Sequence, residues 1–437
     1  MDQVYAIGLF LFVLFLLLGS GVWIGLALLG VAYVGMEIFT ARPIGDAMMT
    51  VMWRSASSWS LTALPMFIWM GEILYRTRLS EDMFRGLAPW MARLPGGLMH
   101  TNIAGCTVFA AVSGSSAATL TTVGKMTIPE LRKRNYPERM VIGTLAGSAT
   151  LGLMIPPSLT LIVYGVSINE SITKLFIAGI LPGLILAAMF MVYVVGASQL
   201  SKSYRPTPEP PMTFMEKVRR SRFLVPVFIL ILLVIGSMYM GVATATEAAA
   251  IGVIGSLLLA AWQRSLSLST FFETLMGAAR TSAMIALILS GAAFLSLAMG
   301  FTGLPRGLAT AIAAMELSRF ELLMVLMVFY IVLGCFLDGI SIVVLTIAIV
   351  EPMIRQTGID IIWFGIFVVL VVEMAQITPP IGFNLFVLQG MTGHEMNFIA
   401  RAALPMFVIM VLMVFLLIAF PELATWLPDN MQPAAGS

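Results

Sequence analysis

The feature of this 437-residue chain that most constrains its fold is a series of long apolar runs that recurs from one end to the other. A helix of about 20 apolar residues crosses the roughly 30 Å hydrocarbon core of a bilayer. Only 11% of the residues are charged and the mean hydropathy is +0.99, whereas soluble domains carry about 25% charged residues. A membrane β-barrel would instead show alternating segments of about 10 residues, and none stands out. We therefore predict an all-α polytopic protein embedded in the lipid bilayer.

Two of the apolar segments are too long for a single crossing. The apolar segments are 4–18, 21–39, 60–75, 98–130, 140–168, 174–198, 223–243, 246–262, 278–299, 321–353, 360–390 and 403–420. Small or polar residues interrupt 98–130 near Ser115 and 321–353 near Asp338. We interpret both segments as re-entrant helical hairpins that enter and leave the membrane on the same side. The remaining segments predict ten transmembrane helices.

Positively charged residues predict the direction of these crossings, since cytoplasmic loops are enriched in Lys and Arg. The stretches 125–139 and 202–222 are both rich in these residues. Placing both in the cytoplasm puts both termini in the periplasm of a multi-pass bacterial inner-membrane protein. The first basic residue is Arg42, so no basic segment indicates a cleavable signal peptide.

The two halves of the chain, 1–198 and 223–437, repeat each other at an offset of 223 residues, with 199–222 as a predicted cytoplasmic linker. Prolines match at this offset in four pairs, which are Pro129 and Pro352, Pro156 and Pro379, Pro157 and Pro380, and Pro182 and Pro405. Each half holds five predicted crossings and one hairpin. Because five is odd, the second half must enter the membrane in the opposite direction. Inverted repeats of this kind are typical of secondary transporters.

Paired prolines interrupt one predicted helix in each half, within 140–168 and within 360–390. Two adjacent prolines remove two N–H donors, and they disfavour helical geometry in the residue before them. Unpaired backbone at mid-membrane depth is tolerated where it lines a cavity or binds a ligand. A structural kink explains one such helix on its own. Two symmetry-related breaks, each preceded by a polar hairpin tip, favour a binding site.

The oxygen atoms near these breaks predict sites for cations and for an anionic substrate. Hydroxyl and carbonyl oxygens suit alkali cations, and half-helix N-termini attract a carboxylate. We expect two or more Na⁺ ions as the bound cofactor. The expected ligands of the first cation site are Ser113, Ser115, Gly152, Ile155 and Pro157. Those of the second site are Asp338, Ala375, Thr378 and Pro380. The residues expected near a substrate anion are Ser116, Ser158, Thr160, Gln376 and Asn384.

Acidic residues inside the apolar segments are further candidates, since ionisable groups in a membrane are usually functional. The best of them is Asp338 at a hairpin tip. Three others lie near segment ends and are interpreted as interfacial, namely Glu72, Glu247 and Glu351. Glu373 leaves two interpretations open, as a structural hydrogen-bond partner or as a ligand of a proton or ion.

Motifs for enzymatic chemistry are missing from the sequence. Neither His100 nor His394 has a second ligand at metal-binding spacing, and a zinc protease motif, a GxSxG elbow and a P-loop are absent. The two cysteines lie in apolar sequence and are interpreted as buried apolar residues. A net charge of +2 does not point to nucleic acid. We expect a secondary active transporter rather than an enzyme, without a nucleic-acid partner.

Three motifs resemble the large membrane subunit of tripartite ATP-independent periplasmic (TRAP) transporters. They are AAVSGSSAAT at 110–119, GLMIPPS at 152–158 and QITPPIG at 376–382. Ala117 departs from the proline that many members carry after the paired serines. The resemblance implies Na⁺-driven uptake of an organic acid by an elevator-type movement. It also implies two partners, a small four-helix membrane subunit and a periplasmic substrate-binding protein.

Other hypotheses remain open from the sequence. One is a carboxylate or cation exchanger of the same architecture that works without a binding protein. A more distant one is a membrane subunit of a respiratory proton pump. Such pumps need several mid-membrane Lys and Glu residues in a line, and Lys is scarce in the apolar segments.

Overall fold

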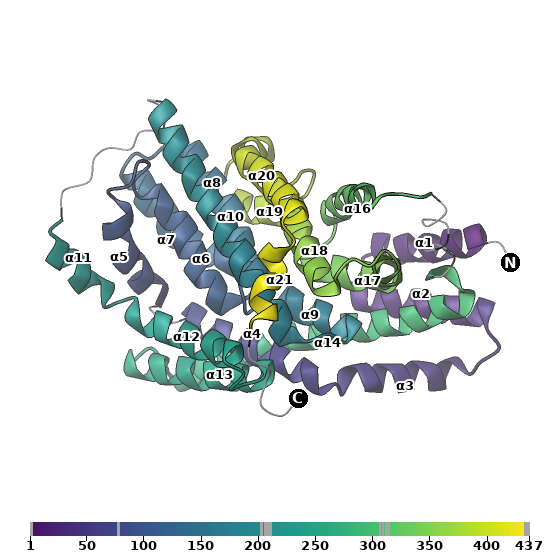
Figure 1. Ribbon diagram of the computed structural model, residues 1–437. Coiled ribbons are helices and arrows are strands. Elements are labelled where there is room, and N and C mark those ends of the chain that lie inside the picture. The colour runs from purple at the N-terminus through teal and green to yellow at the C-terminus, as the bar shows by residue number, and fades with distance from the viewer. Residues whose placement is uncertain are drawn as a thin grey trace.

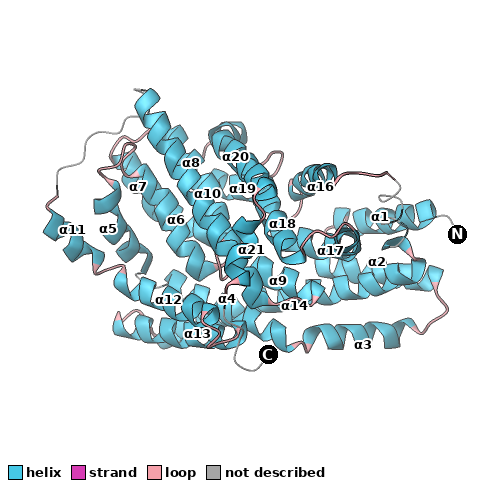
Figure 2. Cartoon of the chain, in the orientation of Figure 1, coloured by secondary structure: helices cyan, strands magenta, loops and turns pink. Residues whose placement is uncertain are grey.

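The structure is a computed structural model, and it confirms the prediction of an all-α protein. The described residues are 3–76, 79–201, 204, 212–305, 307, 310 and 315–431. Within these ranges the chain forms helices and loops and has no β-strand (Figure 2). Most of the proline-rich part of the predicted linker, 205–211, lies outside the described residues.

The N-terminal part of the chain packs on one long helix from the second half. The N-terminal helices are α1 (Gln3–Gly19), α2 (Ile24–Phe39), α3 (Ile44–Ala56), a 3-10 turn (Trp59–Thr62), α4 (Ala63–Arg76) and α5 (Leu79–Met91). Helix α14 (Leu268–Thr302) runs along α2, α3 and α4 (Figure 1). Its 35 residues span about 52 Å, more than the roughly 30 Å of hydrocarbon. Helix α14 must therefore tilt or extend beyond the hydrocarbon core.

The remaining helices form the two hairpins, the two broken helices and their connections. The first half continues with α6 (Met99–Ser113), α7 (Ser116–Lys133), α8 (Glu138–Met154), α9 (Leu159–Ile168) and α10 (Ile172–Leu200). The predicted linker contains α11 (Phe214–Ser221), and the second half begins with α12 (Val225–Tyr239) and α13 (Ala245–Trp262). The second half ends with α16 (Arg319–Gly334), α17 (Gly339–Gln356), α18 (Ile361–Gln376), α19 (Phe383–Thr392), α20 (Met396–Ala419) and α21 (Glu422–Asp429).

Helix boundaries and contacts in the two halves follow the offset seen in the sequence. Helix α7 begins at Ser116 and α17 at Gly339, and each has 18 residues. Helix α8 begins at Glu138 and α18 at Ile361. The contacts are paired in the same way, since α7 packs against α19 while α17 packs against α9. The hairpins and broken helices of both halves thus form one central cluster (Figure 1).

The number of membrane crossings stays a prediction. Six described helices are long and apolar enough to cross a membrane, or seven if α11 and α12, which meet at a bend of 53°, form one span. Three shorter apolar helices are α1, α2 and α18. One of the six helices is α17, an arm of the second hairpin. Another is the broken helix formed by α8 and α9, taken as a single segment. Length and composition alone therefore do not decide between this number and ten crossings with two hairpins.

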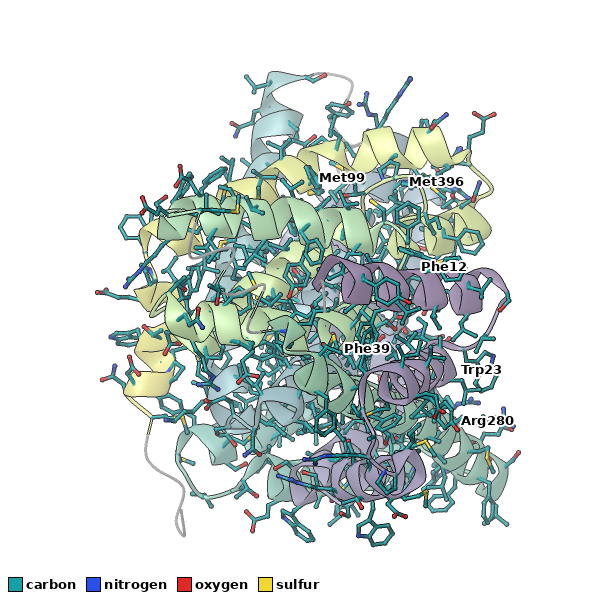
Figure 3. The ribbon with its side chains drawn as sticks, turned by 90° about the vertical axis from the view of Figure 1, so that its right-hand side faces the viewer. Phe12, Trp23, Phe39, Met99, Arg280 and Met396 are labelled. Atoms are coloured by element: carbon teal, nitrogen blue, oxygen red, sulfur yellow. The ribbon has the colours of Figure 1, made fainter. Side chains whose placement is uncertain are left out.

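Large apolar side chains cover the outside of the peripheral helices. Phe12 on α1 is 65% exposed and Trp23 before α2 is 73% exposed, and both lie on the outer surface (Figure 3). Soluble monomers rarely expose contiguous apolar patches larger than a few hundred Å². We therefore expect this surface to contact lipid or a membrane protein partner.

Gly143 allows α8 to approach α20 closely, as small residues do between membrane helices. A Cβ atom at this position would overlap the backbone oxygen of Ala402. We expect Gly143→Ala to destabilise the protein by about 1–3 kcal/mol and to lower the midpoint of thermal unfolding in detergent. Gly196→Ala in α10 is the matched control, since no neighbouring atom lies within 4 Å of its Cβ position. Equal midpoints for both variants would show that α8 and α20 are not closely packed.

Candidate functional site

The first broken helix ends where the prolines require it. Helix α8 ends at Met154, Ile155 is extended with φ −76° and ψ 123°, and Pro156 and Pro157 follow. A proline cannot donate a backbone hydrogen bond, and it disfavours helical geometry in the residue before it. Residues 151–160 are all buried. The freed backbone groups of this break therefore lie inside the protein, away from water.

Ser158 restores two of the hydrogen bonds that the break removes. Its hydroxyl oxygen accepts a hydrogen bond from the Leu161 N–H at 3.2 Å and caps α9. The same hydroxyl donates to the carbonyl oxygen of Leu153 in α8. Ser158 was predicted near a substrate, and the structure places it as a link between the two half-helices.

The tip of the first hairpin is a tight turn between α6 and α7. Gly114 has φ +63°, a left-handed conformation that glycine adopts without steric cost. Ser115 caps α7 by accepting a hydrogen bond from the Ala118 N–H at 3.4 Å. The hydroxyls of Ser113 and Thr119 lie 2.8 Å apart and share a hydrogen bond. The turn thus gathers two hydroxyl groups and the backbone groups of the turn at one point.

This tip contacts the first helix break directly. The Leu159 N–H donates a hydrogen bond to the Gly114 carbonyl oxygen at 3.2 Å. A Cβ atom on Gly152 would lie 2.7 Å from the Ser115 carbonyl oxygen, and one on Gly114 would lie 2.5 Å from the Pro157 carbonyl oxygen. Only glycine at 114 and 152 leaves room for this approach.

The structure therefore brings together most of the residues predicted for the first cation site. Ser115, Gly152 and Pro157 meet at the contact between tip and break, and Ser113 bonds within the tip. Ile155 lies in the break itself and is 5% exposed. Their role as cation ligands stays a prediction.

Asp338 has a structural role at the tip of the second hairpin. Its carboxylate caps α17 by accepting hydrogen bonds from the N–H groups of Ile340 at 3.2 Å and Ser341 at 3.3 Å. It also accepts one from the Ser341 hydroxyl. The side chain is half-buried. Helix capping therefore accounts for this acidic residue without a cation, and a role as cation ligand stays a prediction.

The second hairpin tip packs on the end of α18. A Cβ atom on Gly334 would overlap the Ala375 side chain. The Cys335 thiol donates to the Pro379 carbonyl oxygen at 3.1 Å. The second hairpin thus meets the second break much as the first hairpin meets the first.

The second break differs from the first in its exposure. Pro379 and Pro380 are exposed, and Thr378 donates its hydroxyl to the Met374 carbonyl oxygen at 2.7 Å. Such bonding to the carbonyl four residues earlier is common for threonine in helices. Because the residues of the first break are buried, the two predicted cation sites have different surroundings.

Asn384 connects the predicted substrate residues of both halves. Its amide nitrogen donates to the Ser116 hydroxyl at 2.6 Å across 268 positions of sequence. Ser116 is the first residue of α7 and Asn384 the second residue of α19, so two helix N-termini face one another here. Helix N-termini carry partial positive charge, which favours an anion at this place.

Several predicted substrate residues carry buried polar atoms without a partner. These are the oxygen atoms Thr160 Oγ1, Gln376 Oε1 and Asn384 Oδ1, which have no hydrogen-bond partner in the described chain. Each of these side chains is at most 4% exposed. Leaving a buried acceptor unpaired costs about 1–3 kcal/mol. A bound ligand that donates hydrogen bonds would recover this free energy.

The structure also shows polar residues that the sequence analysis did not select. The hydroxyl of Thr119 forms a hydrogen bond with that of Ser113. Thr119 lies one helical turn after Ser115, and this spacing could have predicted that it lies at the hairpin tip. Asn102 donates to the Val141 carbonyl oxygen at 3.2 Å and lies fully buried between α6 and α8. No local pattern marks this long-range bond.

The other acidic residues have ordinary partners, with one exception. Glu351 pairs with Arg355 at 2.8 Å, and Glu247 closes a capping box at the start of α13. Glu72 lies 3.6 Å from Arg76. In contrast, Glu373 is fully buried, and among the described residues its carboxyl oxygens have no hydrogen-bond partner, so both of its interpretations stay open.

Solved structures with a similar fold are membrane transporters. The YdaH transporter of Alcanivorax borkumensis is similar over 93% of this chain and 97% of its own, with a TM-score of 0.64 and 12% identity. MtrF of Neisseria gonorrhoeae, described within a class of antimetabolite efflux pumps, has a TM-score of 0.58 and 11% identity, and the match covers 86% of this chain and 83% of MtrF. The chain thus shares its overall fold with these two solved proteins.

Sequence comparison identifies the family. Residues 9–423 match the family described as tripartite ATP-independent periplasmic transporter, DctM component, so the chain belongs to this family. The C4-dicarboxylate TRAP transporter large permease protein DctM of Pseudomonas aeruginosa is 30% identical, over 86% of this chain and 88% of that protein. The sialic acid large permease protein SiaM of Vibrio cholerae is 28% identical, over 94% and 96%.

A further relative is longer than this chain. The isethionate TRAP transporter permease protein DctMQ of Oleidesulfovibrio alaskensis is 31% identical over 91% of this chain, which spans 62% of its length. The predicted resemblance to TRAP large permeases is confirmed. The chain is a multi-pass inner-membrane transporter permease and not an enzyme.

Substitution of Asp338 separates helix capping from cation binding. Asparagine caps a helix nearly as well as aspartate, whereas alanine costs about 0.5–2 kcal/mol. We expect Asp338→Asn to keep the unfolding midpoint close to that of the wild type, because the amide oxygen can still accept from the Ile340 and Ser341 N–H groups. The Na⁺ dependence of uptake should weaken, because the negative charge is lost. Asp338→Ala should lower both. Wild-type Na⁺ dependence in Asp338→Asn would leave the residue with a capping role only.

Proposed function

We propose that this chain takes up a small organic acid across the bacterial inner membrane by Na⁺-coupled secondary transport. Relatives are named for C4-dicarboxylate, for sialic acid and for ectoine, and organic acids of this kind are the proposed substrates. The observation that carries the proposal is the buried contact between the first hairpin tip and the first helix break.

The oxygen atoms at this contact support a Na⁺ site. The Ser115 carbonyl lies against Gly152, and the hydroxyls of Ser113 and Thr119 are beside it in the same tip. Hard oxygen ligands without thiolate or imidazole favour alkali cations. A second Na⁺ is proposed at the other tip, with Asp338, Ala375, Thr378 and Pro380 supplying its oxygen atoms. At the first site, burial makes each lost hydrogen bond costly, so a cation bound there would stabilise the contact between tip and break.

The substrate is proposed to bind where α7 and α19 begin. The Asn384–Ser116 hydrogen bond joins two positive helix ends at this place. Gln376 lies close to the start of α17, since a Cβ atom on Gly339 would be 3.1 Å from its amide nitrogen. A carboxylate here would interact with elements of both hairpins and both broken helices.

An elevator movement is the proposed mechanism. The hairpins and broken helices pack mainly on one another, while α2, α3, α4, α13 and α14 form a second set of mutual contacts. We propose that the first set moves against the second as a transport domain against a scaffold. Two inverted repeats with ten crossings and periplasmic termini would supply related states that face opposite sides.

The chain is proposed to work with two partners, a small four-helix membrane subunit and a periplasmic substrate-binding protein. The exposed apolar side chains of the outer helices offer surface for the former. An exchanger of the same architecture that acts without a binding protein is the second candidate.

Gly152→Ala tests the first cation site. The added Cβ would meet the Ser115 carbonyl oxygen at 2.7 Å and push the tip away from the break. We expect Na⁺-driven uptake into proteoliposomes to fall about tenfold, equivalent to about 1.4 kcal/mol, with a higher Na⁺ concentration at half-maximal rate. Gly196→Ala is the control. Unchanged Na⁺ dependence in a folded Gly152→Ala protein would remove this contact from the coupling site.

Reconstitution tests the partners independently. We expect proteoliposomes to take up C4-dicarboxylate or sialic acid only when the small subunit, the binding protein and an inward Na⁺ gradient are all present. Rapid uptake by this chain alone would favour the exchanger instead.

A further inference from the structure

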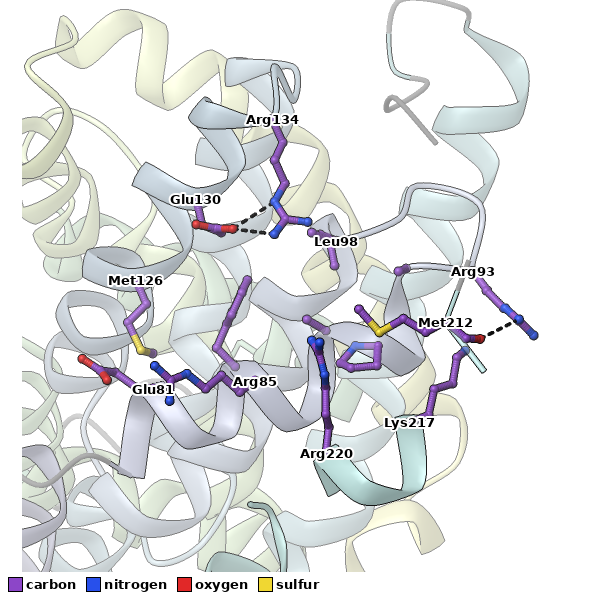
Figure 4. Close-up of a pocket in the computed structure, with 14 residues that line it drawn as sticks. Glu81, Arg85, Arg93, Leu98, Met126, Glu130, Arg134, Met212, Lys217 and Arg220 are labelled. Atoms are coloured by element: carbon purple, nitrogen blue, oxygen red, sulfur yellow. Dashed lines mark hydrogen bonds and ion pairs between the residues drawn. The ribbon is translucent and has the colours of Figure 1, made fainter. Parts of the chain in front are cut away.

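A cavity of about 530 Å³ lies away from the broken helices, between α5, α7 and α11 (Figure 4). Among the described residues, its wall carries five cationic side chains and two acidic ones, a net of three positive charges. The cationic residues are Arg85, Arg93, Arg134, Lys217 and Arg220. The acidic residues are Glu81 and Glu130. A concentration of like charge around one cavity is unfavourable unless an anion compensates it.

Most of this positive charge has no acidic partner. Glu130 pairs with Arg134 at 2.5 Å (Figure 4). Arg93 donates to the neutral carbonyl oxygen of Met212 at 3.1 Å. In the described part of the chain no ion pair involves Arg85, Lys217 or Arg220. These cations therefore remain available to an anion in the cavity.

Contacts between α5 and α11 fix the cavity wall. The Trp90 indole N–H donates to the Ser221 hydroxyl at 2.7 Å. The Trp90 ring also packs edge-on against Phe214, with centroids 6.1 Å apart, and the Lys217 ammonium lies 5.6 Å from its centre. Lys217 is only 6% exposed. These contacts hold Lys217 in the cavity wall, while Arg85 and Arg220 line the cavity as exposed side chains.

The surroundings of the cavity match the surface of a membrane. Phe214 and Met215 on α11 are 70% and 73% exposed, while Arg219 and Arg220 follow on the same short helix. Basic helices with exposed apolar side chains lie in the membrane interface. Basic pockets on the cytoplasmic side of membrane proteins bind anionic lipid head groups.

We propose that this cavity binds the phosphate of an anionic phospholipid head group, with Arg85 and Arg220 as its main ligands. Arginine forms paired hydrogen bonds with phosphate oxygens. The apolar side chains beside the cavity favour a lipid over free phosphate, because they would lie among the acyl chains of the same leaflet. The bound lipid would hold α5 and α11 together at the edge of the molecule.

Native mass spectrometry of the purified full-length chain tests this proposal. Wild-type protein should retain dioleoylphosphatidylglycerol in preference to dioleoylphosphatidylcholine. The double variant Arg85→Gln with Arg220→Gln should bind phosphatidylglycerol about tenfold more weakly. Arg219→Gln is the matched control, since it removes the same charge from α11 outside the cavity lining and should bind as the wild type does.

A second variant keeps the test decisive if the double variant fails to fold. Glu81→Gln leaves every cation in place and removes a negative charge, so it should strengthen phosphatidylglycerol binding. The proposal is overturned by equal retention of both lipids, by an equal loss in Arg219→Gln, or by no gain in Glu81→Gln. Displacement of the lipid by excess inorganic phosphate would identify a free-phosphate site and would likewise overturn it.

Discussion

Two adjacent prolines in a buried membrane helix leave backbone groups that must find partners elsewhere, and the central cluster is organised around this requirement. At the first break, the Gly114 carbonyl oxygen of the hairpin tip accepts a hydrogen bond from the Leu159 N–H. The Ser158 hydroxyl forms hydrogen bonds with both half-helices. The glycines at 114 and 152 permit the close approach. A contact of this kind is a suitable place for coupling, because a bound cation would change the stability of one arrangement of the cluster.

The two halves of the protein depend on one another at the proposed substrate site. Helix α7 of the first half packs against α19 of the second, and α17 packs against α9. The Asn384–Ser116 bond lies at one of these crossings. A ligand bound there interacts with both halves, so a movement of the cluster as a unit keeps the site intact. The second break remains more exposed than the first, which makes the two halves unequal in the state observed.

Local chemistry explains which features could be predicted from the sequence. Glycine, serine and proline act on their immediate neighbours, so the tip between Ser113 and Ser116 and the end of α8 were predictable. The amphipathic helices α3, α5 and α11 were not predicted, because none of them contains a long apolar run. Hydrogen bonds such as that of Cys335 to Pro379, and the difference in exposure between the two breaks, depend on packing between distant segments. No single-sequence pattern encodes them.

We propose that Na⁺ binds at the contact between tip and break and stabilises it. The most direct test of this proposal is the midpoint of thermal unfolding of the purified chain, titrated with sodium chloride against choline chloride at equal ionic strength. A ligand at 100 times its dissociation constant stabilises the folded state by about 2.7 kcal/mol. A saturable increase of the midpoint with Na⁺ alone is the predicted result, and identical curves for the two salts would contradict the account.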